Sequence, residues 1–307
     1  LNMLAQNSAK RVVHRIGKRA ISTNTQSLIQ QELSPTITRL DYAVSDSGTF
    51  SRRDAYRGPL KAAILDWAGT VIDAHVLAPA TCFYQSFARY GVPITMAQAR
   101  EPMGLRKDIH IQKILEMPEV RQKWIDIKGY EPTQETVDEL YAAFVPMQLE
   151  VLGGYTTLIP GTAAAFDAMK SSGMKIGTTT GFTKDMRDIL LPAAKEQGYV
   201  PDSNVAGDEV EFGMGFRPAP FMLYKNLLNL GVYPIDAVLK VDDTNSGIEE
   251  GLNAGCWTVG VYGWGNYTDV DSMEEWEQMS EKEKNERRMK SKRKLIESGA
   301  HYVAESI

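Results

Sequence analysis

The sequence lacks the features of a disulfide-rich, membrane-spanning or strongly charged protein. It contains only two cysteines, Cys82 and Cys256, which cannot form a disulfide framework and lack the spacing to histidine of a metal motif. No apolar run approaches the length of a membrane span. The net charge of −5 is small, so the composition indicates neither a nucleic-acid partner nor a membrane surface. An intracellular, reducing compartment fits these properties best.

The first 58 residues differ in composition from the rest. Five basic residues, from Lys10 to Arg19, precede the first acidic residue, Glu32, and Ser and Thr are frequent. This pattern is typical of an organelle transit peptide that forms a basic amphipathic helix, and it favours the mitochondrion over the plastid. An ordinary disordered leader is the alternative. Because the sequence opens with Leu1 and stops just after a predicted strand, we expect it to be a piece of a longer chain.

After residue 60 the sequence alternates between strand and helix patterns. With 307 residues, of which 43% are hydrophobic, the chain can bury one sizeable core and a smaller second domain. Alternating strands and helices indicate an α/β fold, with a Rossmann-like parallel sheet covered by helices on both faces. The predicted strands are residues 62–65, 175–179, 238–241, 257–261 and 302–304.

Between residues 74 and 155 no segment has the pattern of a strand. Residues 79–90, 106–117 and 134–151 show helical periodicity instead. We therefore predict a core formed by residues 59–75 and 156–307, with an all-helical insertion at 76–155. The charged stretch 274–294 predicts a solvated helix rather than a nucleic-acid patch, because its acidic half precedes its basic half.

Asp66 stands at the most informative position of the chain. The short apolar run 62–65 predicts a buried parallel strand, and it delivers the Asp66 carboxylate into a turn that contains Gly69. The carboxyl edge of such a sheet is where α/β proteins bind ligands. Taken alone, an Asp at this place could equally be a turn or capping residue.

Several separated segments together decide between these alternatives. Asp66-Trp67-Ala68-Gly69-Thr70 resembles the Asp-x-x-x-Thr nucleophile loop of the haloacid dehalogenase superfamily. The chain from about residue 60 to 304 resembles the phosphonoacetaldehyde hydrolase (phosphonatase) family within it. The segments that carry this resemblance are Asp66–Thr70, 103–110, 177–181, 217–218 and 240–243. The resemblance implies that the helical insertion is a cap that closes over the sheet edge and excludes water.

One residue that departs from the superfamily pattern narrows the set of reactions expected of this chain. Most phosphatases of the superfamily carry a second Asp two residues after the nucleophile, which protonates a leaving oxygen; here that residue is Ala68. Cleavage of a carbon–phosphorus bond needs an electron sink instead, and an amine that condenses with a neighbouring aldehyde supplies one. Lys107 can be that amine. The predicted reaction converts phosphonoacetaldehyde to acetaldehyde and phosphate in phosphonate (2-aminoethylphosphonate) degradation, through a Lys Schiff base and an aspartyl phosphate.

The resemblance places the imine chemistry on a predicted helix. Lys107 and His110 lie three residues apart and therefore share a helix face, and Gly104 is expected to mark the start of that helix. A Schiff-base lysine needs a lowered pKa, which burial beside Met103 could produce. We expect His110 to shuttle a proton during imine formation. A packing or surface role is the alternative for His110, and we expect Met103 to contact the substrate.

Two further segments supply groups for the phosphoryl oxygens. Thr180 and Gly181 follow the second predicted strand, where a hydroxyl and free backbone N–H groups can bind phosphate; a plain glycine turn is the alternative. Arg217 stands in a loop of Gly and Pro residues, where its guanidinium can hold two oxygens.

The resemblance also implies a Mg²⁺ site. Its expected ligands are Asp66, the backbone carbonyl of Ala68 and Asp243, which follows the third predicted strand. Here the chain departs from the common Gly-Asp-x-x-x-Asp pattern: Asp242 replaces the Gly, and Gly247 stands where the second Asp is usual. Whether Asp242 compensates, as a ligand or as a partner of the ligands, is left open.

Two other functions are considered beside phosphonate hydrolysis. A phosphate-monoester phosphatase of the same superfamily is disfavoured by Ala68, because nothing obvious would protonate the leaving oxygen. A non-catalytic relative is supported only by Gly247. The expected partners are a small-molecule phosphonate and, by resemblance to the family, a second copy of the chain bound through the cap; no nucleic acid and no membrane are expected.

Overall fold

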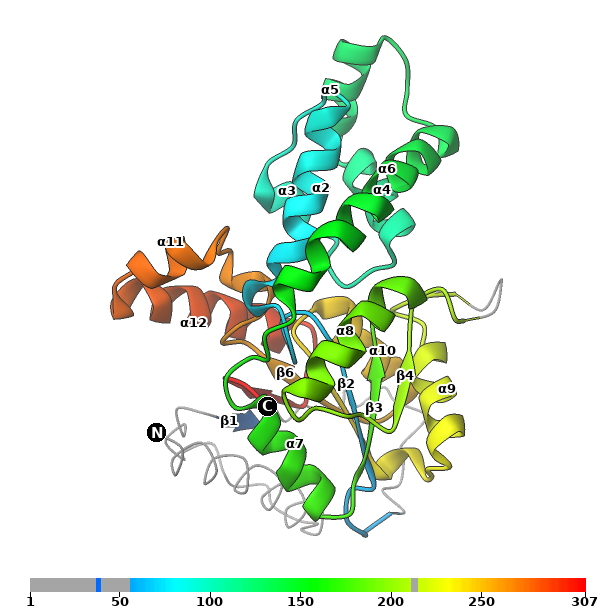
Figure 1. Cartoon of the computed structure of the whole chain (residues 1–307), viewed down its shortest axis with the longest axis vertical. Coiled ribbons are helices and arrows are strands. Elements are labelled where there is room, and N and C mark those ends of the chain that lie inside the picture. Colours follow the sequence, from blue (N-terminus) through cyan, green and yellow to red (C-terminus); the bar gives the residue numbers. More distant parts are fainter. Residues whose placement is uncertain (1–36, 40–55, 211–214) are drawn as a thin grey trace, which may run out of the picture.

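A computed structural model describes residues 37–39, 56–210 and 215–307 of the protein (Figure 1). The predicted leader therefore lies outside the described residues except for 37–39 and 56–58, and its amphipathic helix lies wholly outside them. No helix in the described part is both long enough and apolar enough to cross a membrane.

The strands of the described residues form a single sheet in the order β1-β7-β6-β5-β2-β3-β4. All neighbouring pairs are parallel except β1 with β7. The five predicted strands are present, and the parallel α/β fold is confirmed. The short strands β1 and β4 were not predicted, and β1 lies within the stretch predicted as a leader. The strands are β1 Ile37–Arg39, β2 Ala62–Leu65, β3 Lys175–Thr179, β4 Ser203–Val205, β5 Val238–Asp242, β6 Trp257–Val261 and β7 Tyr302–Ala304.

Helices cover both faces of the sheet because the central strands are apolar on both sides. On β2, Ala63 and Leu65 pack in the cluster that contains Phe166 and Leu190 of helices α7 and α8. Ala62 and Ile64 face the opposite way, toward α9 and α10. The core helices are α7 Thr162–Ser171, α8 Lys184–Glu196, α9 Phe221–Leu230, α10 Asn245–Ala254, α11 Met273–Gln278 and α12 Glu281–Glu297.

The charged stretch predicted as one helix is two helices, α11 and α12. The break occurs at Met279 and Ser280, because the Ser280 side chain accepts a hydrogen bond from the N–H of Glu283 and begins a new helix with a capping box. The prediction of a single helix over 274–294 was therefore wrong at this point.

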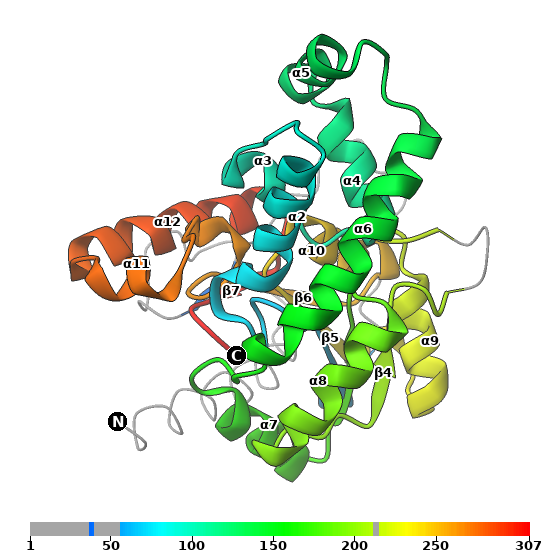
Figure 2. The ribbon, with the colours of Figure 1, turned by 45° about the horizontal axis from the view of Figure 1, so that its top comes forward.

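Every described element between β2 and α7 is a helix, and the helices α2 to α6 stand together beyond one edge of the sheet (Figure 2). The long helix α6 contacts both α2 and α4, and the rings of Phe83 and Phe144 stack between α2 and α6 with centroids 4.3 Å apart. Helices α3 and α5 were not predicted, and the exact cap boundaries stay a prediction. The elements are η1 Ala74–Val76, α2 Leu77–Arg89, α3 Met96–Arg100, α4 Lys107–Glu116, α5 Pro118–Lys128, α6 Gln134–Leu152 and η2 Gly153–Tyr155.

Candidate active site

A cavity lies between the carboxyl edge of the sheet and the helical insertion. Asp66 follows β2 and Thr180 follows β3, and parallel strands bring such residues to the same edge. The insertion contributes Met103, Gly104 and Lys107, so both parts of the chain enclose the site. The lining residues are Asp66, Ala68, Val76, Pro79, Met103, Gly104, Lys107, Thr180, Gly181, Phe182, Arg217 and Thr244.

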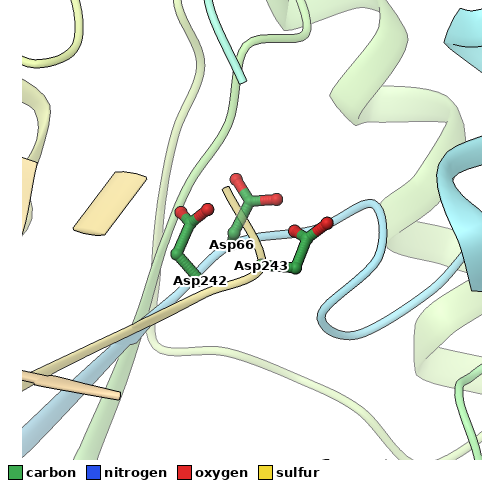
Figure 3. Close-up of side chains that lie close together, drawn as sticks. All are labelled: Asp66, Asp242 and Asp243. Atoms are coloured by element: carbon green, nitrogen blue, oxygen red, sulfur yellow. The ribbon is translucent and has the colours of Figure 1, made fainter. Parts of the chain in front are cut away.

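Three carboxylates converge at this edge (Figure 3). Oxygens of Asp66, Asp242 and Asp243 all lie within 4.8 Å of one another, and all three side chains are buried. Burial, followed by the charge of Asp242, raises the pKa of Asp66 to about 6, although Arg217 and Lys240 act in the opposite direction. Burial, followed by the charge of Asp242, also raises the pKa of Asp243 well above its usual range. Such crowded, dry carboxylates are suited to a bound cation.

Asp243 is held in one orientation by two donors. The hydroxyl of Thr70 donates to its Oδ1 at 3.2 Å, and the backbone N–H of Asn266 donates to its Oδ2 at 2.7 Å. Gly69 passes so close that a Cβ there would lie 2.3 Å from Asp243 Oδ2, and its φ of +81° also favours glycine. The loop Asp66–Thr70 and the Asp243 carboxylate are thus in direct contact.

Arg217, Lys240 and Glu250 form a buried network of ion pairs with the Asp66 and Asp242 carboxylates. The Arg217 guanidinium is 2.8 Å from Asp66 Oδ1 and 2.9 Å from Glu250 Oε2. Lys240 Nζ lies 3.0 Å from both Asp242 Oδ2 and Glu250 Oε2. Sequence reasoning missed Lys240 and Glu250 as site residues. The one available signal was a lysine inside an otherwise apolar strand, because a buried lysine needs a partner.

Arg217, predicted to bind phosphoryl oxygens, does line the cavity. Burial alone would lower its pKa, but Asp242, Glu250 and Asp66 raise that pKa above its usual range. Its Nη2 also donates to Thr179 Oγ1 at 2.6 Å. The guanidinium therefore connects the Asp66 carboxylate to Glu250 and to Thr179.

Lys107 is the first residue of α4, and its side chain reaches the cavity. Only 4% of the residue is exposed, and this burial lowers the pKa of its amine to about 8, with Asp66 acting in the opposite direction. Nζ lies 4.8 Å from the ring centroid of Phe182 and 5.5 Å from that of Phe83. By contrast, the Lys113 side chain on the same helix is 52% exposed and paired with Glu116.

His110 is buried next to this lysine but is absent from the described residues that line the cavity. Its ring stacks on Phe83 with centroids 3.7 Å apart, and Nε2 donates to the Ala99 carbonyl at 2.9 Å. Nδ1 has no hydrogen-bond partner among the described residues. Burial and then the charge of Lys107 lower its pKa well below the usual range, so the imidazole is neutral. Its shuttle role stays a prediction.

The remaining predicted residues all lie at the cavity: Met103, Thr180, Gly181 and Ala68. The hydroxyl of Thr180 accepts a hydrogen bond from the N–H of Phe182 at 3.1 Å, which orients the turn after β3. A Cβ on Gly181 would lie 2.7 Å from the Leu105 carbonyl oxygen, so this turn touches the insertion.

At Gly104 the backbone of the insertion lies against the core. A Cβ there would lie 2.3 Å from Ser246 Oγ and 2.5 Å from Thr244 Oγ1, and the residue has a φ of +92°. The expectation that Gly104 begins the helix was wrong, because α4 begins at Lys107 with Arg106 at its N-cap. Gly104 instead lets the backbone approach the loop after β5.

Comparisons with known proteins agree on one family. The chain is 40% identical over 258 residues to the phosphonoacetaldehyde hydrolase of Syntrophobacter fumaroxidans, covering 84% of this chain and 92% of the relative. It is 43% identical to that of Hahella chejuensis, covering 82% of this chain and 84% of the relative. A crystal structure of a phosphonoacetaldehyde hydrolase-like protein from Oleispira antarctica superposes with a TM-score of 0.77 at 42% identity, covering 81% of this chain and 89% of that one. No protein-family model matches the chain.

Proposed function

Because this chain belongs to the phosphonoacetaldehyde hydrolase family of the haloacid dehalogenase superfamily, we propose that it hydrolyses phosphonoacetaldehyde to acetaldehyde and phosphate. The observation that carries the proposal is one cavity that holds a buried lysine amine and a strand-end carboxylate. Lys107 can bind the aldehyde end of the substrate, while Asp66 can attack its phosphorus. Ala68, where a general acid would otherwise stand, leaves the site without an acid for an oxygen leaving group.

The charges of the site support a divalent metal. Four buried carboxylates, Asp66, Asp242, Asp243 and Glu250, lie with three buried cations, Arg217, Lys240 and Lys107, so one negative charge is in excess when all are ionised. These oxygen donors suit Mg²⁺, and Asp66, the Ala68 carbonyl and Asp243 would hold it. When bound, the ion neutralises charge on the phosphoryl group.

The first step of the proposed mechanism joins the substrate to the enzyme. The neutral amine of Lys107 attacks the aldehyde carbon, and loss of water gives a protonated imine. The pKa of about 8 leaves a useful fraction of the amine neutral near pH 7. His110 lies on the same face of α4 as Lys107, and its Nδ1 has no hydrogen-bond partner among the described residues. We propose that His110 moves a proton during this step.

In the second step the Asp66 carboxylate attacks phosphorus in line. The electrons of the carbon–phosphorus bond flow into the iminium and give an enamine on Lys107, while phosphorus becomes bonded to Asp66. Arg217, Thr180 and the N–H groups near Gly181 stabilise the charge of the transferring group. The enamine takes a proton on carbon and is hydrolysed to acetaldehyde, and water then cleaves the aspartyl phosphate.

The runner-up, a phosphate-monoester phosphatase, needs an acid for its leaving oxygen. Among the described residues, Asp66 contributes the single carboxylate that lines the cavity, and it is assigned as the nucleophile.

Incubation with Mg²⁺ and phosphonoacetaldehyde, coupled to reduction of acetaldehyde, tests the first function, and a panel of phosphate monoesters tests the second. We expect acetaldehyde release and no comparable phosphate release from the monoesters. The opposite pattern would favour the phosphatase, and neither activity would favour a non-catalytic relative.

We also propose that two copies associate through the cap. Large apolar side chains are exposed on it, with Tyr84 on α2 at 41%, Ile127 on α5 at 49% and Tyr130 just after α5 at 51%. Sedimentation or light scattering of the protein and of Tyr84→Glu tests this association. A monomeric wild-type protein at micromolar concentration would contradict it.

A further inference from the structure

We propose that Asp242 is a positioning residue of the metal site, and that Gly247 is glycine because the Asp242 carboxylate occupies the space of its side chain. The inference rests on the Mg²⁺ site of the proposed function and adds a residue to it. Asp242 acts through its charge and through Arg217, without binding the ion itself.

The two oxygens of the Asp242 carboxylate have different surroundings: Oδ1 accepts hydrogen bonds, whereas Oδ2 faces two cations and accepts no hydrogen bond from the described residues. Its Oδ1 accepts hydrogen bonds from the backbone N–H of Thr244 at 3.0 Å and from the Thr244 hydroxyl at 2.7 Å. Its Oδ2 lies 3.0 Å from Lys240 Nζ and 3.5 Å from Arg217 Nη2. With no exposed surface, and with Oδ2 facing the positive charges of Lys240 and Arg217, this carboxylate is placed to orient those groups rather than to coordinate an ion.

Gly247 lies in the first turn of α10, directly against this carboxylate. An ideal Cβ at position 247 would lie 1.9 Å from Asp242 Oδ2 and 2.0 Å from its Cγ. Real atoms cannot approach so closely, so a side chain at 247 and a carboxylate at 242 exclude each other. Thr244 links the two positions, because its hydroxyl donates to Asp242 and accepts from the Gly247 N–H at 3.2 Å. Only one of the two positions can therefore supply a carboxylate to this space.

The charge count gives Asp242 its function. It contributes one of the four buried carboxylates, and without it the site would lose its excess negative charge over Arg217, Lys240 and Lys107. A divalent cation would then be attracted less strongly. Arg217 would also lose one of the partners that orient its Nη2 toward Asp66. Loss of an outer partner of a metal site typically costs about 10–100-fold in metal affinity.

The exclusion between the two positions suggests an exchange experiment. Mg²⁺ affinity is measured calorimetrically without substrate for the wild type, Asp242→Asn, Asp242→Gly, Gly247→Asp and the double variant Asp242→Gly/Gly247→Asp. Asp242→Asn keeps the shape and removes the charge, so we expect the Mg²⁺ affinity of the folded variant to fall about 10–100-fold. Its melting temperature should fall as well, because the buried Lys240 loses one of its partners. Gly247→Asp should lose Mg²⁺ affinity or fold poorly, because its Cβ meets the Asp242 carboxylate. The double variant returns a carboxylate to the same space and should recover most of the affinity.

Kinetics distinguish positioning from a merely structural role. For Asp242→Asn the Mg²⁺ concentration that gives half-maximal activity should rise in parallel with the dissociation constant, and excess Mg²⁺ should restore much of kcat. Wild-type Mg²⁺ affinity in Asp242→Asn would overturn the charge argument. A folded double variant no better than Asp242→Gly would overturn the shared-space argument. If the wild type binds Mg²⁺ and the variants follow the expected order, but phosphonoacetaldehyde is not cleaved, the proposed function fails and this inference stands.

Discussion

The buried amine of Lys107 leads to a prediction about where and at what pH an imine forms. The pKa of about 8 makes roughly one Lys107 in ten neutral at pH 7, against fewer than about one in a thousand for an ordinary exposed lysine. A small aldehyde such as acetaldehyde should therefore react at Lys107 about a hundredfold or more in preference to an unperturbed lysine. The reason is burial, which disfavours the ammonium form.

The assay traps the imine with cyanoborohydride and acetaldehyde between about pH 6 and pH 10. The modified peptide is identified by mass spectrometry at low extent of reaction. Because the neutral amine is the nucleophile, labelling should rise with pH, about tenfold per unit below pH 8, and level off above it. Lys107→Arg should remove both the label and acetaldehyde release, since a guanidinium does not form the imine.

Lys113→Arg is the matched control, because Lys113 lies on the same helix but is exposed. It should label and turn over like the wild type. Preferential labelling of Lys113, or a labelling rate that keeps rising toward pH 10, would refute the reasoning from burial. Acetaldehyde release by Lys107→Arg at a comparable rate would refute the Schiff-base assignment itself.

Three further predictions concern the nucleophile, the metal and the contact between cap and core. Asp66→Asn should lower turnover by about a thousandfold or more with an unchanged circular dichroism spectrum, and activity within tenfold of wild type would exclude covalent catalysis by Asp66. Chelation should abolish activity, Mg²⁺ should restore it, and Asp243→Asn should raise the Mg²⁺ requirement at least about tenfold; an unchanged requirement would remove Asp243 from the ligand set. Gly104→Ala should lower kcat/KM much more than Gly129→Ala. Both glycines have a positive φ, but of these two only position 104 would bring a Cβ within 2.5 Å of the core. Equal effects of the two substitutions would mean that backbone strain alone matters.

Much of the fold could be predicted because its signals are local. The run Ala62–Leu65 is short, apolar and followed by a carboxylate, and it forms β2 with those bounds. The absence of strand patterns between 74 and 155 likewise matches the helices found there. Helix α3 was missed, because its five residues complete barely one turn.

The site was only partly predictable, because a contact across the fold leaves little trace in the sequence. Asp66, Lys107 and Arg217 were selected by their motifs, and the structure gathers them around one cavity. Lys240 and Glu250 were missed, because a strand lysine and a helix glutamate become an ion pair, with Glu250 also paired to Arg217, only after β5 and α10 pack together.

The sequence by itself determined the succession of strands and helices along the chain. It also determined which chemical groups are available to the site. Strand and helix periods act over a few residues, so burial on each face can be read along the chain. Only the tertiary structure decided that Lys107 lies buried against Phe182, that Gly104 contacts the loop after β5, and that Asp242 occupies the space beside Gly247. These relations depend on distances between segments far apart in sequence, and close packing allows just one set of neighbours.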